Sequence, residues 1–75
     1  MVYRQYIERN PDIMLGKPII KGTRITVELV MRKLADGYNI ADLLNSYPHL
    51  REKQILAALE YAADMIANED TLETA

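Results

Sequence analysis

Apolar residues recur with helical spacing in the middle of the chain, from Thr26 onward. Thr26 is a favourable N-cap residue, Glu28 lies in the first turn, and Gly37 can supply the left-handed residue that ends a helix. We therefore predict an amphipathic helix over residues 26–36. The apolar face of this helix is formed by Val27, Val30, Met31 and Leu34.

Two further helices are predicted after the first one. Asn39, with Asp42 three residues later, resembles a capping box, and the proline at position 48 limits the helix that follows to residues 40–47. A longer helix is predicted over residues 51–67, and the tail 70–75 has little apolar surface to bury and is expected to fray. The main inward stripe of the long helix is predicted to be Ile55, Leu59, Ala62 and Ile66.

Short apolar runs alternate with turn residues in the first part of the chain, which predicts a β arm or hairpin over residues 5–25. The extended candidates are Gln5–Glu8, Ile13–Leu15 and Pro18–Ile20. The predicted fold class is therefore mainly α, with three helices after a short N-terminal β element. A short helix, a tight turn and a longer helix form the helix-turn-helix arrangement, which often binds DNA through the last helix.

The chain has 75 residues and no cysteine, so we expect a single domain over residues 1–75. A core of this size supports only marginal stability, and without disulfides or thiolate metal sites self-association is the remaining route, so a homo-oligomer is expected. No apolar run reaches the ~20 residues of a membrane span, and no signal-peptide pattern follows the first residue. We therefore expect a cytoplasmic protein that does not enter the membrane.

The net charge of −2 is unevenly distributed along the chain. Residues 1–38 contain seven basic and four acidic residues, whereas residues 39–75 contain two basic and seven acidic residues. This division indicates two surfaces with different partners, or a chance fluctuation of the kind that small proteins show.

The sequence offers little support for catalysis. His49 is the only histidine and follows a proline in a turn, with no serine or cysteine nucleophile in a recognisable motif beside it. Glu60 and Asp64 share one helical face, but no second ligand cluster accompanies them, so a solvated acidic face is favoured over a metal site. The glycine spacing fits neither nucleotide-binding motif. We therefore expect that the protein is not an enzyme and that it binds neither a metal ion nor a cofactor.

Basic and amide side chains make DNA a candidate partner. Arginine and lysine can read guanine edges, glutamine can read adenine, and lysines near a helix start can contact phosphates. The acidic residues of the last helix oppose deep docking in the major groove, and a solvated basic rim remains the alternative. The candidate DNA-binding residues are Arg24, Arg32, Lys33, Arg51, Lys53 and Gln54. The candidate phosphate or arm contacts are Lys17, Lys21, Thr23 and Thr26.

Several short motifs are spread over residues 6–66. They are Asn10-Pro11, Gly16-Lys17-Pro18, Gly22-Thr23-Arg24-Ile25, Leu34-Ala35-Asp36-Gly37, Tyr47-Pro48-His49-Leu50, Ala57-Ala58-Leu59 and Tyr61-Ala62. Together they closely resemble a bacterial and archaeal family first catalogued as domain-of-unknown-function family 433. The resemblance implies a homeodomain-like helix-turn-helix domain that is usually dimeric. It also implies an antitoxin of the VapB type, which neutralises a PIN-like nuclease toxin and represses its own promoter. Directly after the motif Tyr47-Pro48-His49-Leu50, the family often has Thr or Ser, whereas this chain has Arg51.

Two functional hypotheses follow. The first is an antitoxin and DNA-binding autoregulator, whose acidic residues Glu60 and Asp64 face the basic toxin. The second is a non-catalytic protein-interaction module that has the three-helix fold and does not bind DNA.

Overall fold

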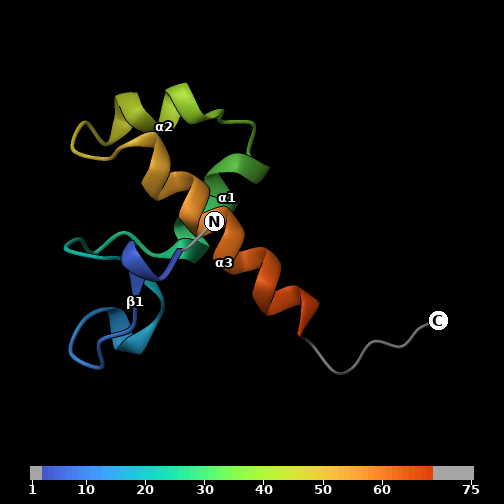
Figure 1. Ribbon diagram of the computed structural model, residues 1–75. Coiled ribbons are helices and arrows are strands. Elements are labelled where there is room, and N and C mark those ends of the chain that lie inside the picture. Colours follow the sequence, from blue (N-terminus) through green and yellow to red (C-terminus); the bar gives the residue numbers. More distant parts are fainter. Residues whose placement is uncertain (1–2, 69–75) are drawn as a thin grey trace.

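Three helices follow a short two-stranded hairpin in the computed structural model, which describes residues 3–68 (Figure 1). The predicted fraying of residues 70–75 lies outside the described residues. The helices are α1 (Val27–Ala35), α2 (Ile40–Ser46) and α3 (Glu52–Ala67), and the strands are β1 (Ile7–Glu8) and β2 (Ile19–Ile20). Two 3₁₀ turns precede the strands, η1 at Tyr3–Gln5 and η2 at Met14–Gly16. The mainly α fold with a short N-terminal β element is as predicted.

The β element is an antiparallel pair in which Ile7 lies opposite Ile20. A second, tighter reversal follows β2, because the Ile20 amide donates to the Ile25 carbonyl at 2.9 Å and the Val27 amide donates to the Pro18 carbonyl at 2.9 Å. The chain thus enters α1 directly from a hairpin, which fixes the β element against the first helix.

The prediction of an extended segment at Ile13–Leu15 is wrong, because a 3₁₀ turn occupies Met14–Gly16. Met14, Leu15 and Gly16 have φ values of 50°, 59° and 78°, so three consecutive residues adopt the left-handed region. Amide hydrogen bonds from Gly16 to the Ile13 carbonyl and from Lys17 to the Met14 carbonyl close this turn. The chain must reverse here to pair β2 with β1, and this non-local pairing overrides the extended preference of the apolar residues.

The helix boundaries agree closely with their local signals. The Thr26 hydroxyl accepts from the Leu29 amide at 2.9 Å and caps α1, and Gly37 follows this helix with a φ of 101°. Asn39 and Asp42 form a reciprocal capping box at the start of α2, with bonds of 2.8 and 2.9 Å. These side chains satisfy amide groups that the first turn of a helix leaves without partners.

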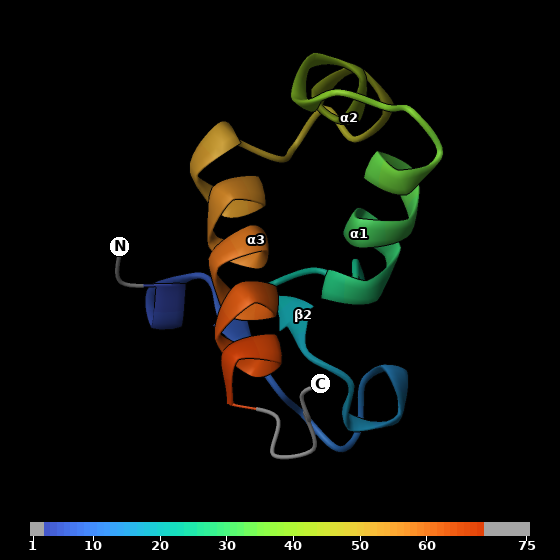
Figure 2. The same ribbon diagram turned by 90° about the vertical axis from the view of Figure 1, so that its right-hand side faces the viewer.

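The core lies where α3 crosses the other elements. Figure 2 shows α1 and α2 on one side of α3, which also packs against β1. The largest fully buried side chains are Ile19, Ile20, Val30, Leu43 and Ile55. The predicted inward stripe of α3 is only partly correct: Ile55 is buried, but Ala57 and Ala58 complete the buried face, and Ile66 is 65% exposed.

Candidate functional site

Two turns that are far apart in the sequence form one groove. The turn Gly22–Ile25, after β2, lies beside residues 46–50, which connect α2 to α3. Together they enclose a volume of about 420 Å³ with a mainly apolar lining. Leu50 is buried in this region, whereas Arg24 and His49 are exposed. The groove therefore has a mainly apolar lining, and the exposed side chains of Arg24 and His49 are among the residues that border it.

The first of these turns is held by a threonine side chain. The Thr23 hydroxyl donates to the Ile20 carbonyl at 2.7 Å and accepts from the Ile25 amide at 2.9 Å, and Gly22 provides the left-handed φ of 82°. The hydroxyl of Thr26, which is 7% exposed, caps α1. Both hydroxyls predicted as phosphate contacts are thus engaged within the fold.

Exposed basic residues lie in or next in sequence to the two turns that form the groove. Arg24 extends from the first turn, and Arg51 and Lys53 follow the second turn at the start of α3. Lys21 is exposed at the tip of the reversal after β2. No ion pair between residues 3 and 68 involves any of these four side chains. We define Arg24, Arg51 and Lys53 as the basic end of the molecule.

Other predicted DNA contacts lie away from the basic end and have partners of their own. The Glu28 carboxylate forms ion pairs with Lys17 at 3.0 Å and with Arg32 at 3.1 Å. The Lys33 ammonium lies 4.8 Å from the centre of the Tyr38 ring. The hydrogen bond from Lys17, followed by that from Arg32, lowers the pKa of Glu28 below its usual value. This carboxylate offsets part of the positive charge that the sequence alone suggested for the region.

Gln54 has a structural role at the start of α3. Its side-chain oxygen accepts a hydrogen bond of 2.7 Å from the Arg51 amide, in the place of a conventional N-cap. Arg51 itself has no side-chain acceptor to offer the helix. A bidentate contact with adenine needs the oxygen and the nitrogen of the Gln54 amide, so the oxygen that caps α3 would have to accept a second hydrogen bond or leave the cap.

The acidic residues of α3 differ in their surroundings. A hydrogen bond with the Asp64 carboxylate, with burial as the next cause, raises the pKa of the Tyr3 phenol. Asp64 therefore faces the N-terminal arm of the protein itself. Glu60 is half-buried on the same helix and has no ion pair within residues 3–68.

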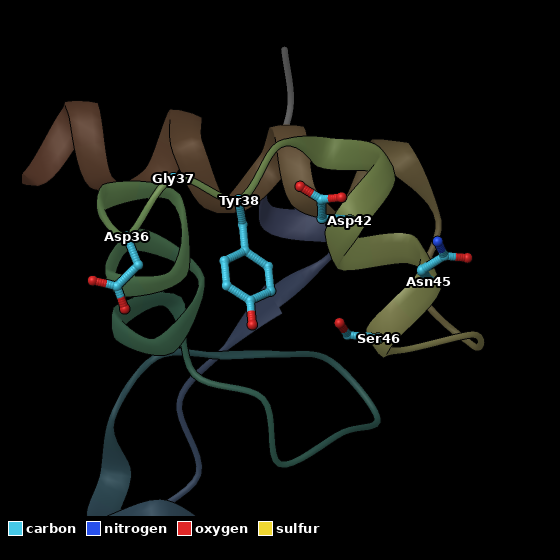
Figure 3. Close-up of a pocket in the computed structure, with 6 residues that line it drawn as sticks. All are labelled: Asp36, Gly37, Tyr38, Asp42, Asn45 and Ser46. Carbon is cyan, nitrogen blue, oxygen red and sulfur yellow. The ribbon is translucent and has the colours of Figure 1, made fainter.

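A second pocket, of about 440 Å³, lies between the end of α1 and α2 (Figure 3). Its lining is polar and includes Asp36, Tyr38, Asp42 and Ser46. Asp42 is engaged in the capping box of α2. Within the part of the chain that the structure describes, no group of three or more acidic or histidine side chains is placed to hold a metal ion.

The sequence did not reveal that the two turns share a groove. Both turns were recognisable as motifs, but the apposition of residues 22–25 with residues 46–50 depends on how α1 and α2 pack. The signal available in the sequence was that each turn combines apolar residues with a basic or histidine side chain. Spacing along the chain carries no further information about their contact.

Fold and site together define a small helical domain with an N-terminal β hairpin and a groove beside the start of its last helix. None of the helices in the described part of the chain has the length and apolar character needed to span a membrane. The chain belongs to the family described as "Protein of unknown function (DUF433)", which matches residues 7–62. The family membership that the motifs indicated is thereby confirmed.

Two relatives illustrate this membership. The chain is 34% identical over 59 residues to "Uncharacterized protein y4eO" of Sinorhizobium fredii (strain NBRC 101917 / NGR234), covering 79% of this chain and 27% of that protein. The crystal structure of a DUF433 member protein from Anabaena variabilis ATCC 29413 is similar, with a TM-score of 0.81 at 26% identity. That match covers 85% of this chain and 63% of the other. The chain thus spans about a quarter of the curated relative's length and less than two thirds of the crystallised chain.

Proposed function

We propose that this protein is a non-enzymatic DNA-binding regulator of the antitoxin type, which binds operator DNA and a PIN-like nuclease toxin. The observation that carries the proposal is the basic end. There Arg24 flanks the groove that precedes α3, and Arg51 and Lys53 are exposed on the first residues of that helix. The start of the last helix is the part of a helix-turn-helix domain that contacts DNA.

The contact with DNA is mainly electrostatic. Beyond its first turn, α3 exposes Leu56 and carries the half-buried Leu59 and Glu60, and neither apolar nor acidic side chains favour a phosphate-lined groove. DNA is therefore engaged by the end of the helix, where the three basic side chains reach phosphates and base edges together. Such binding has modest specificity and depends strongly on salt.

A binding titration with the DNA upstream of the protein's own gene tests this proposal. We expect binding at low salt, with a logarithmic affinity that falls linearly with the logarithm of salt concentration. Removal of Arg24 or Lys53 by alanine substitution should reduce the slope by about 0.9 per lost phosphate contact. Arg4→Ala, which removes one exposed charge from the N-terminal arm, is the matched control and should leave the slope unchanged. Absence of binding, or binding without salt dependence, rejects the proposal.

The toxin contact is assigned to the acidic residues of α3. Glu60 is the better candidate because Asp64 lies beside the Tyr3 phenol of the same chain and raises the pKa of that phenol. Co-purification from the native host, with a PIN-like nuclease encoded in the neighbouring reading frame as the expected partner, tests this part. Loss of the nuclease from a Glu60→Lys variant, but not from a Glu52→Lys variant, would support the assignment.

A second candidate function, a protein-interaction module without DNA binding, is favoured by one observation. α3 exposes the large apolar side chains Leu56, Met65 and Ile66, and exposed apolar surface on small proteins commonly contacts other proteins. Two results together would favour this alternative. The native chain would not bind DNA, and a variant that lacks all three residues of the basic end would still bind its protein partner.

A further inference from the structure

The groove between the two turns exposes apolar surface that the chain does not cover. Leu50 is buried there, whereas Ile25 and Tyr47 are only half-buried and Pro48 is exposed. Its volume of about 420 Å³ lies in the range of about 300–1,000 Å³ that is typical of ligand sites. The groove therefore has room for a large apolar group.

Both walls of the groove are held by hydrogen bonds within the chain. In the first wall, the Thr23 hydroxyl connects the Ile20 carbonyl to the Ile25 amide. In the second wall, the Leu50 amide donates to the Tyr47 carbonyl at 2.9 Å. A groove that is already formed favours binding, because less conformational entropy is lost when a ligand enters.

The charged groups at the groove are predominantly basic. Within the described chain none of the residues that line the groove is acidic, and the exposed lining residues include Arg24 and His49. Arg51 and Lys53 follow the second wall, with Glu52 as the one acidic residue between them. The positive end of the α3 dipole lies at the same place. The groove therefore favours a partner that combines an apolar group with negative charge.

The lining and the spread of charge favour a peptide over other anions. Apart from Tyr47 and His49, the apolar lining is aliphatic, whereas single-stranded nucleic acid is bound by successive aromatic rings on which its bases stack. A small ligand with one carboxylate would use one basic side chain, but basic residues extend past the groove into α3. An apolar anchor with a charged rim is the usual arrangement of a protein–protein interface.

We propose that this groove binds an extended segment of a partner protein, in which acidic residues flank one large apolar residue. The apolar side chain occupies the groove, and the acidic side chains contact Arg24 on one wall and Arg51 and Lys53 after the other. This inference does not depend on DNA binding or on a toxin. The partner is opposite in charge to the basic toxin assigned to Glu60, so the groove is a separate protein-binding surface.

Selection from a random peptide display library on the immobilised full chain provides the first test. We expect the recovered peptides to share a leucine, isoleucine, phenylalanine or methionine next to aspartate or glutamate. The same selection on the Arg24→Glu variant should not recover them, whereas Arg4→Glu, the matched control on an exposed arginine of the N-terminal segment, should. Failure to enrich any peptide, or enrichment of basic or uncharged peptides, overturns the proposal.

Affinity measurements with a recovered peptide, made synthetically and followed by fluorescence anisotropy, provide the second test. Arg24→Glu and His49→Glu should each weaken binding by about fivefold or more, because they place like charges against the peptide. Both side chains are exposed, so these variants keep their fold, which circular dichroism can verify. Arg4→Glu should leave the affinity unchanged. Alanine in place of the apolar residue of the peptide should weaken binding by about tenfold or more.

Chemical-shift mapping by NMR locates the bound peptide, and we expect the changes to be centred on residues 22–25 and 46–53. Changes centred elsewhere, or an affinity that the alanine peptide retains, overturn the proposal. Two further results assign the groove to another occupant and also reject the proposal. One is a concentration-dependent change at residues 22–25 without peptide, which indicates a second copy of the chain. The other is displacement of the peptide by a single-stranded oligonucleotide that binds the groove more tightly.

Discussion

The guanidinium of Arg9 donates two hydrogen bonds to the hydroxyl of Tyr61, at 3.1 and 2.8 Å, although 52 positions separate the two residues. The ring of Tyr61 also meets the ring of Tyr3 edge to face, with centroids 5.4 Å apart. Tyr61 thus joins α3 to the chain on both sides of β1, through Tyr3 before the strand and Arg9 after it. A small protein with a limited core gains from such a long-range connection, because it couples the N-terminal segment to the longest helix.

The contribution of this connection can be measured with Tyr61→Phe, which removes the hydroxyl and keeps the ring. The bonds are exposed to solvent, so we expect a loss of about 0.5–1 kcal/mol in the free energy of unfolding, measured by urea titration. Arg9→Ala should cost a similar amount. The double variant should then be little worse than either single one, whereas strictly additive losses would show that the pair contributes nothing beyond its separate members.

Glu28 should give the protein a dependence on acid pH. Its pKa lies below the ordinary value of 4.5, chiefly because Lys17 and then Arg32 bond to the carboxylate. Because the pKa of Glu28 is lower in the folded chain than in the unfolded chain, the carboxylate stabilises the fold at pH values above the pKa of the unfolded chain. This stabilisation is lost as the pH falls through the pKa of the folded chain. Native protein should therefore be more stable than Glu28→Gln at neutral pH, with the difference shrinking below about pH 4.5.

Thermal unfolding at a series of pH values measures this difference. Because the ion pairs are exposed, 1 M salt should reduce the difference at neutral pH and provides an internal control. A difference that persists unchanged to pH 2 would show that Glu28 acts through packing or helix propensity and not through its charge.

Local signals in the sequence were sufficient for the helix boundaries. Thr26, the pair Asn39 and Asp42, and Gly37 act on amides or φ angles within a few residues of themselves, so no tertiary information is needed to interpret them. The charged side chains of the candidate site were also identifiable. Which of them have partners was not, because the contact between Lys17 and Glu28 spans eleven positions and depends on the packing of α1.

Two features could not be read from periodicity. α3 has apolar residues on most of its circumference, so the stripe through Ile66 was as regular as the buried one, and only packing against α1 and β1 distinguishes them. The turn at Met14–Gly16 contains two residues that disfavour left-handed backbone. Its conformation is imposed by the pairing of β1 with β2, and this pairing is a non-local property.

The left-handed turn makes Leu15 a position where substitution should stabilise the protein. Leu15 has a φ of 59° and is 92% exposed, so it is strained and buries almost nothing. Leu15→Gly relieves a strain of about 1–2 kcal/mol and costs about 0.5–1 kcal/mol in unfolded-state entropy. We expect a net gain of about 0.5–1 kcal/mol by chemical denaturation. Leu15→Ala retains the strain and serves as the control; an equal gain from Ala would contradict this explanation.

The start of α3 combines a weak cap with a charge, and one substitution should separate the two effects. Arg51 offers no acceptor to the first turn, and the only side-chain bond there is the one that Gln54 accepts from the Arg51 amide. Arg51→Ser supplies an N-cap hydroxyl and should raise the free energy of unfolding by about 0.5–1 kcal/mol. The same substitution removes one charge from the basic end.

If Arg51 serves DNA binding, the more stable Arg51→Ser variant should bind DNA more weakly, with a shallower salt dependence. Arg51→Ala removes the charge without adding a cap, so it should weaken DNA binding equally while leaving stability nearly unchanged. Equal DNA affinity in all three proteins would show that the arginine has no role in DNA binding. A gain in stability confined to the serine variant would still identify the cap as the cause, because alanine cannot accept a hydrogen bond from the helix.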